Sequence, residues 1–194
     1  MTKTIENLVK AFIGESQARN RYTIYASQAK KEGYEQLAGI FEETANQEFE
    51  HGEWNFKMLK ELLAKEGADM PELKVEAGAP TTWGSLIENL KGAIAGENWE
   101  HTTMYPEFAE QAKKDGYLEV AKRLLSIAKA EEHHEERYLK YVKVLEDGTV
   151  FKKEKKVWWY CRKCGYMHFG EEAPTTCPSC GHAQGFYQMK CEEY

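Results

Sequence analysis

Apolar side chains recur at spacings of three and four residues in four long stretches of the first 148 residues. This period places them on one face of a helix, so the pattern predicts four amphipathic helices. The positions expected to face a shared core are Leu8, Phe12, Glu15, Arg19 and Tyr22 in the first stretch; Leu37, Phe41, Thr44, Glu48, His51, Asn55, Met58 and Leu62 in the second; Leu86, Leu90, Ala93, Glu97, Glu100, Met104 and Phe108 in the third; and Val120, Leu124, Ile127, Glu131, His134, Tyr138, Tyr141 and Leu145 in the fourth.

Two segments of this helical part repeat each other. Gln28-Ala-Lys-Lys-Glu-Gly-Tyr34 returns, 83 residues later, as Gln111-Ala-Lys-Lys-Asp-Gly-Tyr117. The glycine in each copy predicts the end of one helix and the start of the next. We therefore expect two helix hairpins joined by a crossover near residues 67–82, which could permit helix exchange between subunits. The predicted fold class is mainly α, a four-helix bundle with one long crossover.

The composition of the chain changes after Glu146-Asp-Gly148. The remaining residues are rich in aromatic, cysteine and turn-forming residues, and all five cysteines lie there. We expect a helical domain at residues 1–148 and a second, small domain at residues 149–194.

Net charge limits the classes of partner. The chain has 32 acidic and 26 basic residues and a net charge of −6, which argues against nucleic acid as the main partner. It contains no apolar run of the ~18 residues that a membrane span requires. Its first residues lack the order of a secretory signal, so we expect a cytoplasmic location with no membrane partner.

The middle of each helical stripe is ionisable, although its ends are apolar. Glu15, Glu48, Glu97 and Glu131 occupy these middle positions. Burying even one unpartnered charge is strongly unfavourable, so four carboxylates in one core require positive charge among them. Two divalent cations would supply it.

Two Glu-x-x-His motifs strengthen this metal hypothesis. They are Glu48–His51 and Glu131–His134, and the three-residue spacing puts both side chains of a motif on one helix face. Both motifs fall on a core stripe at matching points of the repeat. Together with one further Glu from each half, they form the ligand set of di-iron carboxylate bundles. Carboxylate and imidazole ligands suit iron or manganese.

The second repeat carries one extra residue between Glu97 and Tyr105, beside Pro106. Glu100 lies in the same stretch, on the same helix face as Glu97. Because proline removes a backbone hydrogen bond and π-bulges are frequent at functional sites, we predict a π-bulge or kink between Glu97 and Pro106.

Three other charged or titratable residues are not expected to bind metal. His101 and His133 lie outside the Glu-x-x-His frame, although the position of His101, four residues after Glu97, leaves a metal-facing role open. Arg19 interrupts the first stripe, and we expect it to pair with an acidic residue of the core.

The C-terminal region contains two Cys-x-x-Cys motifs, Cys161–Cys164 and Cys177–Cys180, separated by twelve residues. Four thiolates at this spacing predict one tetrahedral metal site, with iron and zinc both open. So short a domain buries little core, so the metal would contribute folding energy. The aromatic residues expected to surround it are Trp158, Tyr160, Tyr166, Phe169 and Phe186. Cys191 is left over and is expected to be a free thiol.

These motifs, in this order, resemble the rubrerythrin family along nearly the whole chain. The residues that carry the resemblance are Gly14-Glu-Ser-Gln-Ala-Arg-Asn-Arg-Tyr22, the two Glu-x-x-His motifs, Ala95-Gly-Glu97-Asn-Trp-Glu100, Met104-Tyr-Pro106 and the two cysteine motifs. The resemblance implies a ferritin-like bundle with a non-haem di-iron centre and a rubredoxin-like domain with one tetrathiolate iron, hence three iron ions per subunit. It also implies reduction of hydrogen peroxide to water and protection against oxidative stress.

The resemblance also implies roles for individual residues. Glu15, Glu48, Glu97, Glu131 and His134 match di-iron ligands of the family, and Glu100 and His51 match the pair that exchange on one iron as its oxidation state changes. Tyr22 and Tyr105 match tyrosines beside the centre that orient carboxylates. Cys161, Cys164, Cys177 and Cys180 match the ligands of the electron-transfer iron. The family implies a homodimer or larger homo-oligomer, and an electron donor such as rubredoxin or a flavin- or NADH-dependent reductase.

Two alternative functions are consistent with parts of the sequence. A ferritin-like ferroxidase that stores iron would use the same bundle, and a large mineral core would reveal it. A non-redox protein would use the cysteine motifs as a zinc ribbon, and the absence of the red colour of oxidised tetrathiolate iron would favour it.

Overall fold

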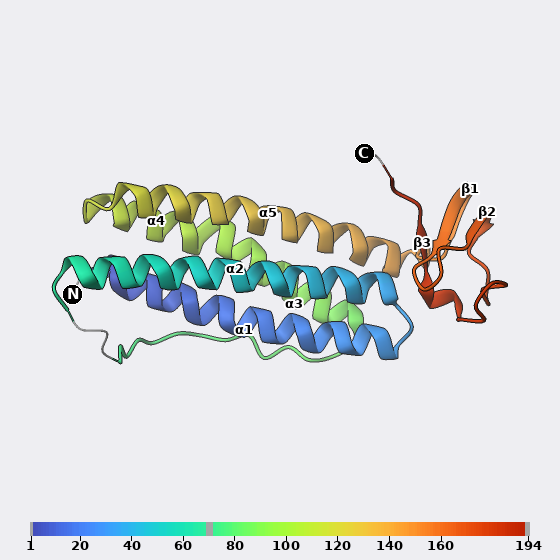
Figure 1. Ribbon diagram of the computed structural model, residues 1–194, viewed down its shortest axis with the longest axis horizontal. Helices are drawn as coiled ribbons and strands as arrows, with labels where there is room; N and C mark the ends of the chain where they lie inside the picture. The colour runs from blue at the N-terminus through green and yellow to red at the C-terminus, as the bar shows by residue number, and fades with distance from the viewer. Residues whose placement is uncertain (1, 69–71, 193–194) are drawn as a thin grey trace.

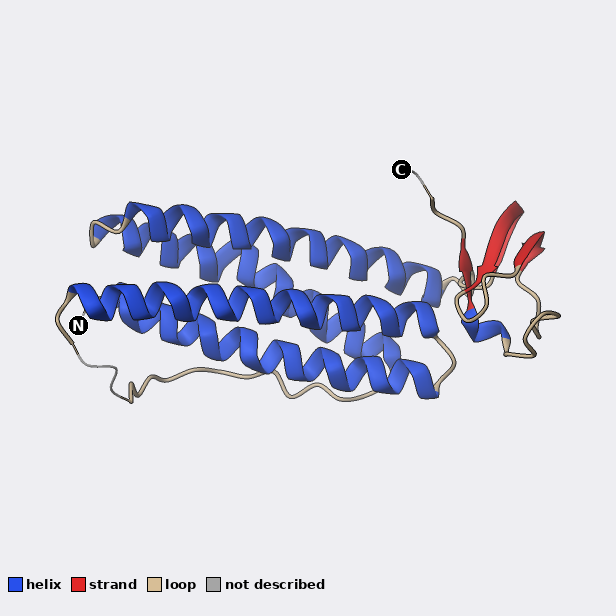
Figure 2. Ribbon diagram, viewed as in Figure 1, coloured by secondary structure: helices blue, strands red, loops and turns tan. Residues whose placement is uncertain are grey.

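The structure is a computed structural model that describes residues 2–68 and 72–192. Helices dominate it: α1 (Lys3–Lys31), α2 (Glu35–Lys65), α3 (Leu86–Trp99), α4 (Tyr105–Lys114) and α5 (Leu118–Glu146). The helices lie side by side as a long bundle, and a small sheet lies at one end (Figures 1 and 2). Among the described residues, no helix is both long and apolar enough to cross a lipid bilayer.

The two halves of the sequence repeat form two helix hairpins. α1 turns into α2 at Gly33 (φ +80°), and α4 turns into α5 at Gly116 (φ +86°), the equivalent position of the repeat. A side chain at such a left-handed position would be strained, which explains glycine in both copies. With α3 and α4 as one interrupted helix, the prediction of a four-helix bundle with one long crossover is confirmed.

The interruption between α3 and α4 is a π-helix, η1 (Glu100–Met104). The backbone amide of Tyr105 donates to the carbonyl oxygen of Glu100, five residues earlier. The predicted π-bulge between Glu97 and Pro106 is therefore confirmed, and its wide turn accommodates the extra residue of the second repeat.

The crossover that joins α2 to α3 runs beside α1 along the length of the bundle (Figure 1). The Tyr25 hydroxyl donates to the carbonyl oxygen of Thr82 at 2.5 Å, and the Gln28 side-chain amide donates to that of Gly84 at 2.8 Å. Residues 69–71 of the predicted crossover lie outside the described residues. Helix exchange between subunits stays a prediction.

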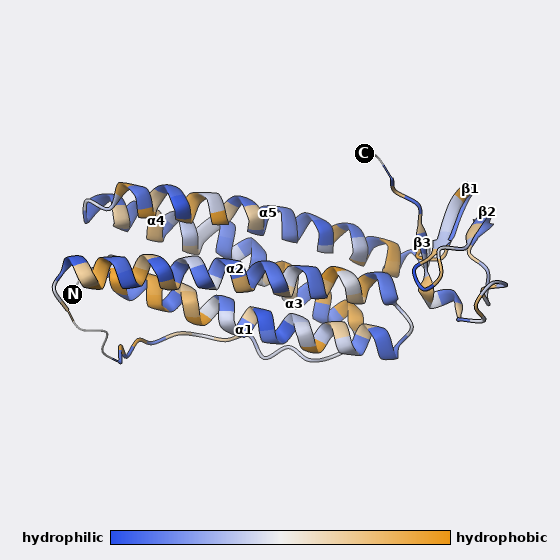
Figure 3. Ribbon diagram, viewed as in Figure 1, coloured by the Kyte–Doolittle hydropathy of each residue, from blue (hydrophilic) through white to orange (hydrophobic). Residues whose placement is uncertain are grey.

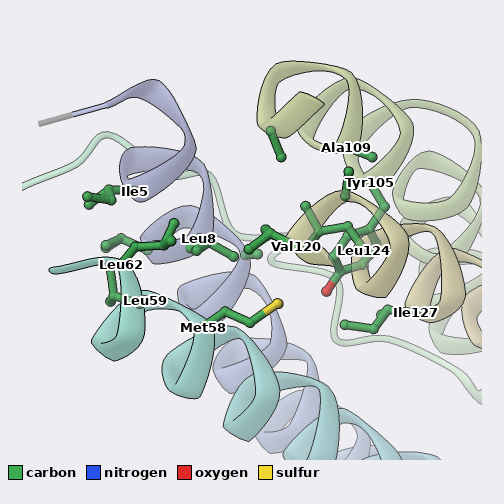
Figure 4. Packing of buried hydrophobic residues seen from close by; sticks show 14 of the residues in the cluster. Ile5, Leu8, Met58, Leu59, Leu62, Tyr105, Ala109, Val120, Leu124 and Ile127 are labelled. Atoms are coloured by element: carbon green, nitrogen blue, oxygen red, sulfur yellow. The ribbon is translucent and has the colours of Figure 1, made fainter. Parts of the chain in front are cut away.

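Two apolar clusters fill the ends of the bundle, and buried polar side chains form a polar layer between them. Hydrophobic and hydrophilic residues are interspersed along the helices (Figure 3). In the cluster farther from the sheet, Leu8 of α1 and Leu62 of α2 face Val120 and Leu124 of α5 (Figure 4). In the cluster nearer the sheet, Tyr22, Phe41, Leu90 and Tyr138 are fully buried. Fully burying one such side chain contributes about 1.5–3 kcal/mol, so the bundle ends stabilise the polar middle.

The C-terminal region forms an antiparallel sheet in the order β2-β1-β3, from β1 (Lys152–Cys161), β2 (Met167–Glu172) and β3 (Tyr187–Met189), with a 3₁₀ turn at Gln184–Phe186. Trp159, Cys161, Cys177 and Tyr187 form its core, with Phe186 packed against it.

The predicted aromatic surroundings of the cysteines are therefore only partly right. Phe186 is confirmed, but Trp158 and Phe169 are about half exposed and pack on each other with ring centroids 5.1 Å apart. Tyr160 is partly buried and Tyr166 is exposed. Because successive strand residues point to opposite faces, Trp159 shares the face of Cys161 and Trp158 does not.

The sheet region contacts the end of the bundle where α1 turns into α2. The rings of Tyr34 and Phe151 are stacked at 5.8 Å, and a Cβ atom placed on Gly185 would lie 2.0 Å from the carbonyl oxygen of Gly33. Only glycine at position 185 allows the two backbones to approach this closely.

Candidate metal centre

Each helix of the bundle contributes an ionisable side chain to the polar layer. Glu15 comes from α1, Glu48 from α2, Glu97 from α3 and Glu131 from α5, and each is at most 1% exposed. The imidazole of His134 is 2% exposed. A helix rises 1.5 Å per residue, so positions near the middle of four antiparallel helices meet at one level.

The ligand atoms form two groups that share two residues. The first group is Glu15, Glu48, His51 and Glu131, and the second is Glu48, Glu97, Glu131 and His134. Within each group the ligand atoms all lie within 4.8 Å of one another. The shared residues, Glu48 and Glu131, are therefore placed to bridge two cations.

The orientation of the two shared carboxylates supports bridging. Glu131 directs Oε1 at the Nδ1 atom of His51 and Oε2 at that of His134, both at 2.8 Å. Glu48 likewise directs Oε2 at His51 (3.1 Å) and Oε1 at His134 (3.2 Å). Each carboxylate thus offers one oxygen to each group, beside that group's imidazole.

The other two glutamates are held by tyrosines from the opposite half of the repeat. The hydroxyl of Tyr22 donates a hydrogen bond to Glu97, and the hydroxyl of Tyr105 donates one to Glu15. The Asn55 side-chain amide donates to the Tyr105 hydroxyl at 3.1 Å. These contacts fix which oxygen of each glutamate remains available to a cation.

Glu100 is 5% exposed but belongs to neither group of ligand atoms, whereas His51 belongs to the first. Glu100 is the first residue of the π-helix, one turn after Glu97. The structure thus places the imidazole in the centre and this carboxylate at its margin.

The layer retains protons when no cation neutralises it. Burial raises the pKa of Glu15 well above its usual range, and the charges of Glu131 and Glu48 raise it further. Burial and the charge of Glu48 raise the pKa of Glu97 to about 8. Burial opposes protonation of His51, but hydrogen bonds to Glu131 and Glu48 outweigh it and raise the pKa of His51 to about 10.

A pair of cations fits this arrangement. One oxygen of Glu15 is buried with no hydrogen-bond partner, and burial together with the neighbouring carboxylates of Glu131 and Glu48 opposes ionisation of Glu15. Bound cations would take the place of the protons that burial now retains. The donor set of carboxylates and imidazoles suits iron or manganese.

The structure also places the residues that were expected not to bind metal. His101 pairs with Glu135 at 2.6 Å, and His133 is exposed. The expectation that Arg19 pairs with a core acid is wrong. Arg19 is exposed and its guanidinium lies over the ring of Phe49 at 4.6 Å, at the surface between α1 and α2 rather than in the core.

Sequence reasoning missed two residues behind the centre. The side chains of Gln47 and Arg137 lie on the far side of the His134 ring from the carboxylates. Their positions in the sequence could have indicated a place near the centre, since Gln47 precedes Glu48 directly and Arg137 follows His134 by three residues.

A cavity of about 410 Å³ reaches the centre from the surface between α1 and α2. Phe12, Phe49 and Phe56 provide most of its apolar wall, and Glu15 and Glu48 line it as well. The cavity thus connects the surface with carboxylates of the first group.

The four cysteines of the sheet region gather at one point. Their Sγ atoms lie within 4.8 Å of one another, with Cys161 and Cys180 at 3.8 Å and Cys164 and Cys177 at 3.6 Å. A tetrahedral site with metal–sulfur bonds of about 2.3 Å has edges of about 3.8 Å, so the thiols fit one metal ion. Cys191 is exposed and free.

Comparisons with known proteins cover both the helical part and the cysteine-containing part of the chain. The family model described as rubrerythrin matches residues 6–142, and that of the rubredoxin-like domain of rubrerythrin matches residues 159–188. A rubrerythrin of Porphyromonas gingivalis is 47% identical over 100% of this chain and 92% of its own length.

Two solved structures share the fold. Fully reduced, all-ferrous nigerythrin superposes with a TM-score of 0.63 at 30% identity, covering 96% of this chain and 86% of the other. The bacterioferritin of Desulfovibrio desulfuricans superposes with a TM-score of 0.65 at 23% identity, covering 75% of this chain and 81% of the other, and shows the ferritin-like fold alone.

Proposed function

The chain belongs to the rubrerythrin family, and we propose that it is a hydrogen peroxide reductase. The family makes it an iron-dependent oxidoreductase with a ferritin-like di-iron site and a four-cysteine rubredoxin-like site, three iron ions per subunit. The reduction of peroxide to water is the part that we propose.

One observation carries the proposal: two buried ligand groups share Glu48 and Glu131 on the same chain as a tetrathiolate site. In the proposed assignment, Glu15 and His51 complete one iron site, and Glu97 and His134 complete the other. Cys161, Cys164, Cys177 and Cys180 hold the third iron.

When bound, two ferrous ions supply one electron each and act as Lewis acids, which is the requirement for cleaving one O–O bond. The residues of the chain keep that pair in place. Glu48 and Glu131, which both ligand groups share, would hold the two ions together, while Tyr22 and Tyr105 hold Glu97 and Glu15 in fixed orientations. Such preorientation costs nothing during the reaction.

Glu100 and His51 are the proposed exchanging pair. A carboxylate would suit a ferric ion and an imidazole a ferrous ion, and His51 is the member of this pair whose ligand atom lies among those of Glu15, Glu48 and Glu131. The π-helix at Glu100 supplies a wide backbone turn where a side chain can move.

Substrate and electrons reach the centre from different directions in this proposal. Peroxide enters through the cavity between α1 and α2, past Phe12 and Phe49. Electrons enter singly at the four-cysteine site from a donor such as rubredoxin or a flavin- or NADH-dependent reductase.

We further propose a homodimer or larger homo-oligomer in which one subunit's cysteine site serves another subunit's di-iron site. A cytoplasmic location and a role in oxidative stress stay predictions.

Anaerobic oxidation of the reduced protein tests the proposal. The iron-loaded chain is reduced and mixed in separate experiments with equal concentrations of hydrogen peroxide and dioxygen, and the di-iron absorbance is followed by stopped flow. We expect peroxide to oxidise the di-iron centre much faster than dioxygen. A preference for dioxygen, with iron accumulating as a mineral, would instead identify a ferroxidase.

A further inference from the structure

The two histidines of the centre, His51 and His134, differ in the contacts of Nε2, the ring nitrogen that points away from the carboxylates. The Nδ1 atom of His134 faces Glu131, Glu48 and Glu97 at 2.8–3.3 Å. Its Nε2 atom lies 3.0 Å from Oε1 of Gln47. Both ring nitrogens of His134 are therefore engaged.

Arg137 fixes the orientation of the Gln47 amide. One terminal nitrogen of its guanidinium donates to Oε1 of Gln47 at 3.2 Å and to the hydroxyl of Thr44 at 2.7 Å, and the other pairs with Glu43 at 3.1 Å. A guanidinium only donates, so the amide must present its oxygen here. Because that oxygen can only accept hydrogen bonds, Nε2 of His134 must carry the hydrogen and donate it, which leaves the lone pair on Nδ1 for a cation.

His51 has no comparable contact in the part of the chain that the structure describes. The polar contacts of its ring run from Nδ1 to Glu48 and Glu131, on the cation side. No side chain or backbone group there forms a hydrogen bond with its Nε2 atom. Its side chain is 13% exposed, against 2% for His134.

We propose that Gln47 and Arg137 are positioning residues that make His134 the permanent imidazole ligand. The absence of such a contact leaves His51 as the imidazole that is free to exchange. This inference rests on the proposed function insofar as it takes both histidines as iron ligands. A neutral amide behind His134 also makes that imidazole less electron-rich than a carboxylate would.

Substitutions at Gln47 separate these effects. Gln47→Leu removes the acceptor and keeps the volume, whereas Gln47→Glu keeps an acceptor and adds charge beside Arg137. Asn46→Leu is the matched control, because Asn46 is the preceding residue of α2 and is exposed. The full chain, with its cysteine site filled, is titrated anaerobically with ferrous ion, and the reduction potential of the di-iron centre is then measured.

We expect Gln47→Leu to weaken ferrous binding at the His134 position about 10–100-fold, the usual effect of removing a hydrogen bond behind a ligating histidine. Gln47→Glu should retain the affinity within a few-fold and shift the reduction potential to a lower value, because a carboxylate makes the imidazole a stronger donor to ferric iron. Asn46→Leu should match the unmodified chain in both measurements.

Equal ferrous affinity and equal potential in Gln47→Leu and Asn46→Leu would overturn the proposal. Helicity and thermal unfolding of the metal-free variants show whether Gln47→Leu folds. If it does not, Arg137→Met replaces it, and weakened binding that Arg137→Lys restores in part would support the proposal. Unchanged binding in Arg137→Met would contradict it. Iron binding requires no peroxide, so a chain that passes this test but fails to reduce peroxide refutes only the proposed function.

Discussion

Glu131 illustrates how the centre works at the scale of single residues. Its carboxylate is fully buried and directs one oxygen at each of two imidazoles. Such a group is stable in a protein core only when opposite charge surrounds it, and here protons or cations must provide that charge. The residues of the layer therefore form one electrostatic unit, and changing one of them affects the others.

Replacing Glu97 tests whether the two metal sites are independent. Glu97→Ala removes the glutamate that only the second ligand group contains. We expect the variant to lose most iron from the di-iron centre while keeping the red colour of the oxidised tetrathiolate iron. Iron analysis and visible absorbance check this. Loss of both signals would show that the sites depend on each other.

The retained protons predict how metal binding depends on pH. The pKa of Glu97 is raised to about 8 and that of His51 to about 10, so both groups carry protons in the metal-free protein at neutral pH. A cation must displace them, so the ferrous affinity should rise from about pH 6 to about pH 8, by about tenfold per unit for each proton displaced. Calorimetry in buffers of different ionisation enthalpy counts those protons. Affinity independent of pH would contradict the predicted protonation.

The same pKa shifts predict how the free energy of unfolding of the metal-free protein changes with pH. A folded-state pKa above the unfolded value stabilises the fold at low pH, and this contribution is lost as pH rises through the folded pKa. For Glu97 the window runs from 4.5 to about 8. The pKa of Glu48 is lowered to about 2, because hydrogen bonds to His134 and His51 outweigh the effect of burial. The contribution of Glu48 is constant above its unfolded value. The free energy of unfolding of the metal-free protein should therefore be lower at about pH 8 than at about pH 6.

At the scale of elements, the π-helix distinguishes the third helix of the bundle from the other three. α1 reaches from Glu15 to Tyr22 in seven residues, whereas the third helix reaches from Glu97 to Tyr105 in eight. Both tyrosines nevertheless hold a glutamate of the opposite half. The wide turn of η1 accommodates the extra residue, so Glu97 and Tyr105 keep positions equivalent to those of Glu15 and Tyr22.

Deleting Thr103 tests the function of this turn. Without the extra residue, Glu100–Met104 can become an ordinary α-helix, and the two tyrosine contacts can be kept. We expect the unfolding temperature of the metal-free protein to rise by about 2–4 °C for each kcal/mol that the regular α-helical hydrogen bonds contribute, while di-iron occupancy stays the same.

Peroxide turnover should fall in the deletion variant, because Glu100 would lose the local widening that permits its exchange with His51. Steady-state peroxide consumption and scanning calorimetry measure the two effects. Unchanged turnover would show that the π-helix has no part in the reaction.

At the scale of the whole molecule, the chain joins two metal sites of different chemistry. The four cysteines belong to the small sheet region, which lies at one end of the bundle (Figure 1). The buried carboxylates lie between the two apolar clusters of the bundle. Thiolate ligands suit repeated transfer of one electron, while carboxylates and imidazoles leave room for substrate. The connection of the two on one chain favours a redox cycle over iron storage.

Removing one thiolate tests this connection. Cys161→Ser should block the return of electrons to the di-iron centre, so steady-state peroxide turnover should fall to near zero. A chemically reduced sample of the variant should still consume peroxide once, because its carboxylate layer is intact. Stopped-flow measurement of a single turnover separates the two results. Normal steady-state turnover would refute the electron relay.

Much of the fold could be predicted from the sequence because the signals are local and repeated. The period of Leu8 and Phe12, the two glycine turns and the extra residue before Tyr105 each report on neighbouring residues, and the helices and the π-helix followed from them. The aromatic core of the sheet region could not be predicted in the same way. Trp158 and Trp159 are adjacent and equally hydrophobic, so the sequence does not distinguish them. The pairing of β1 with its neighbouring strands decides which of the two is buried.

Helical period and internal repetition are enough to place four glutamates and two histidines at matching positions in the core of one bundle. The spacing of the two Cys-x-x-Cys motifs likewise predicts that four cysteines form one site. The folded chain was needed to show that Glu48 and Glu131 are the shared carboxylates and that Arg19 lies on the surface. It was also needed to show that Gln47 contacts His134 from behind and that Arg137 contacts Gln47. These features depend on the rotation of each helix and on contacts between residues as many as 90 positions apart, which no local pattern encodes.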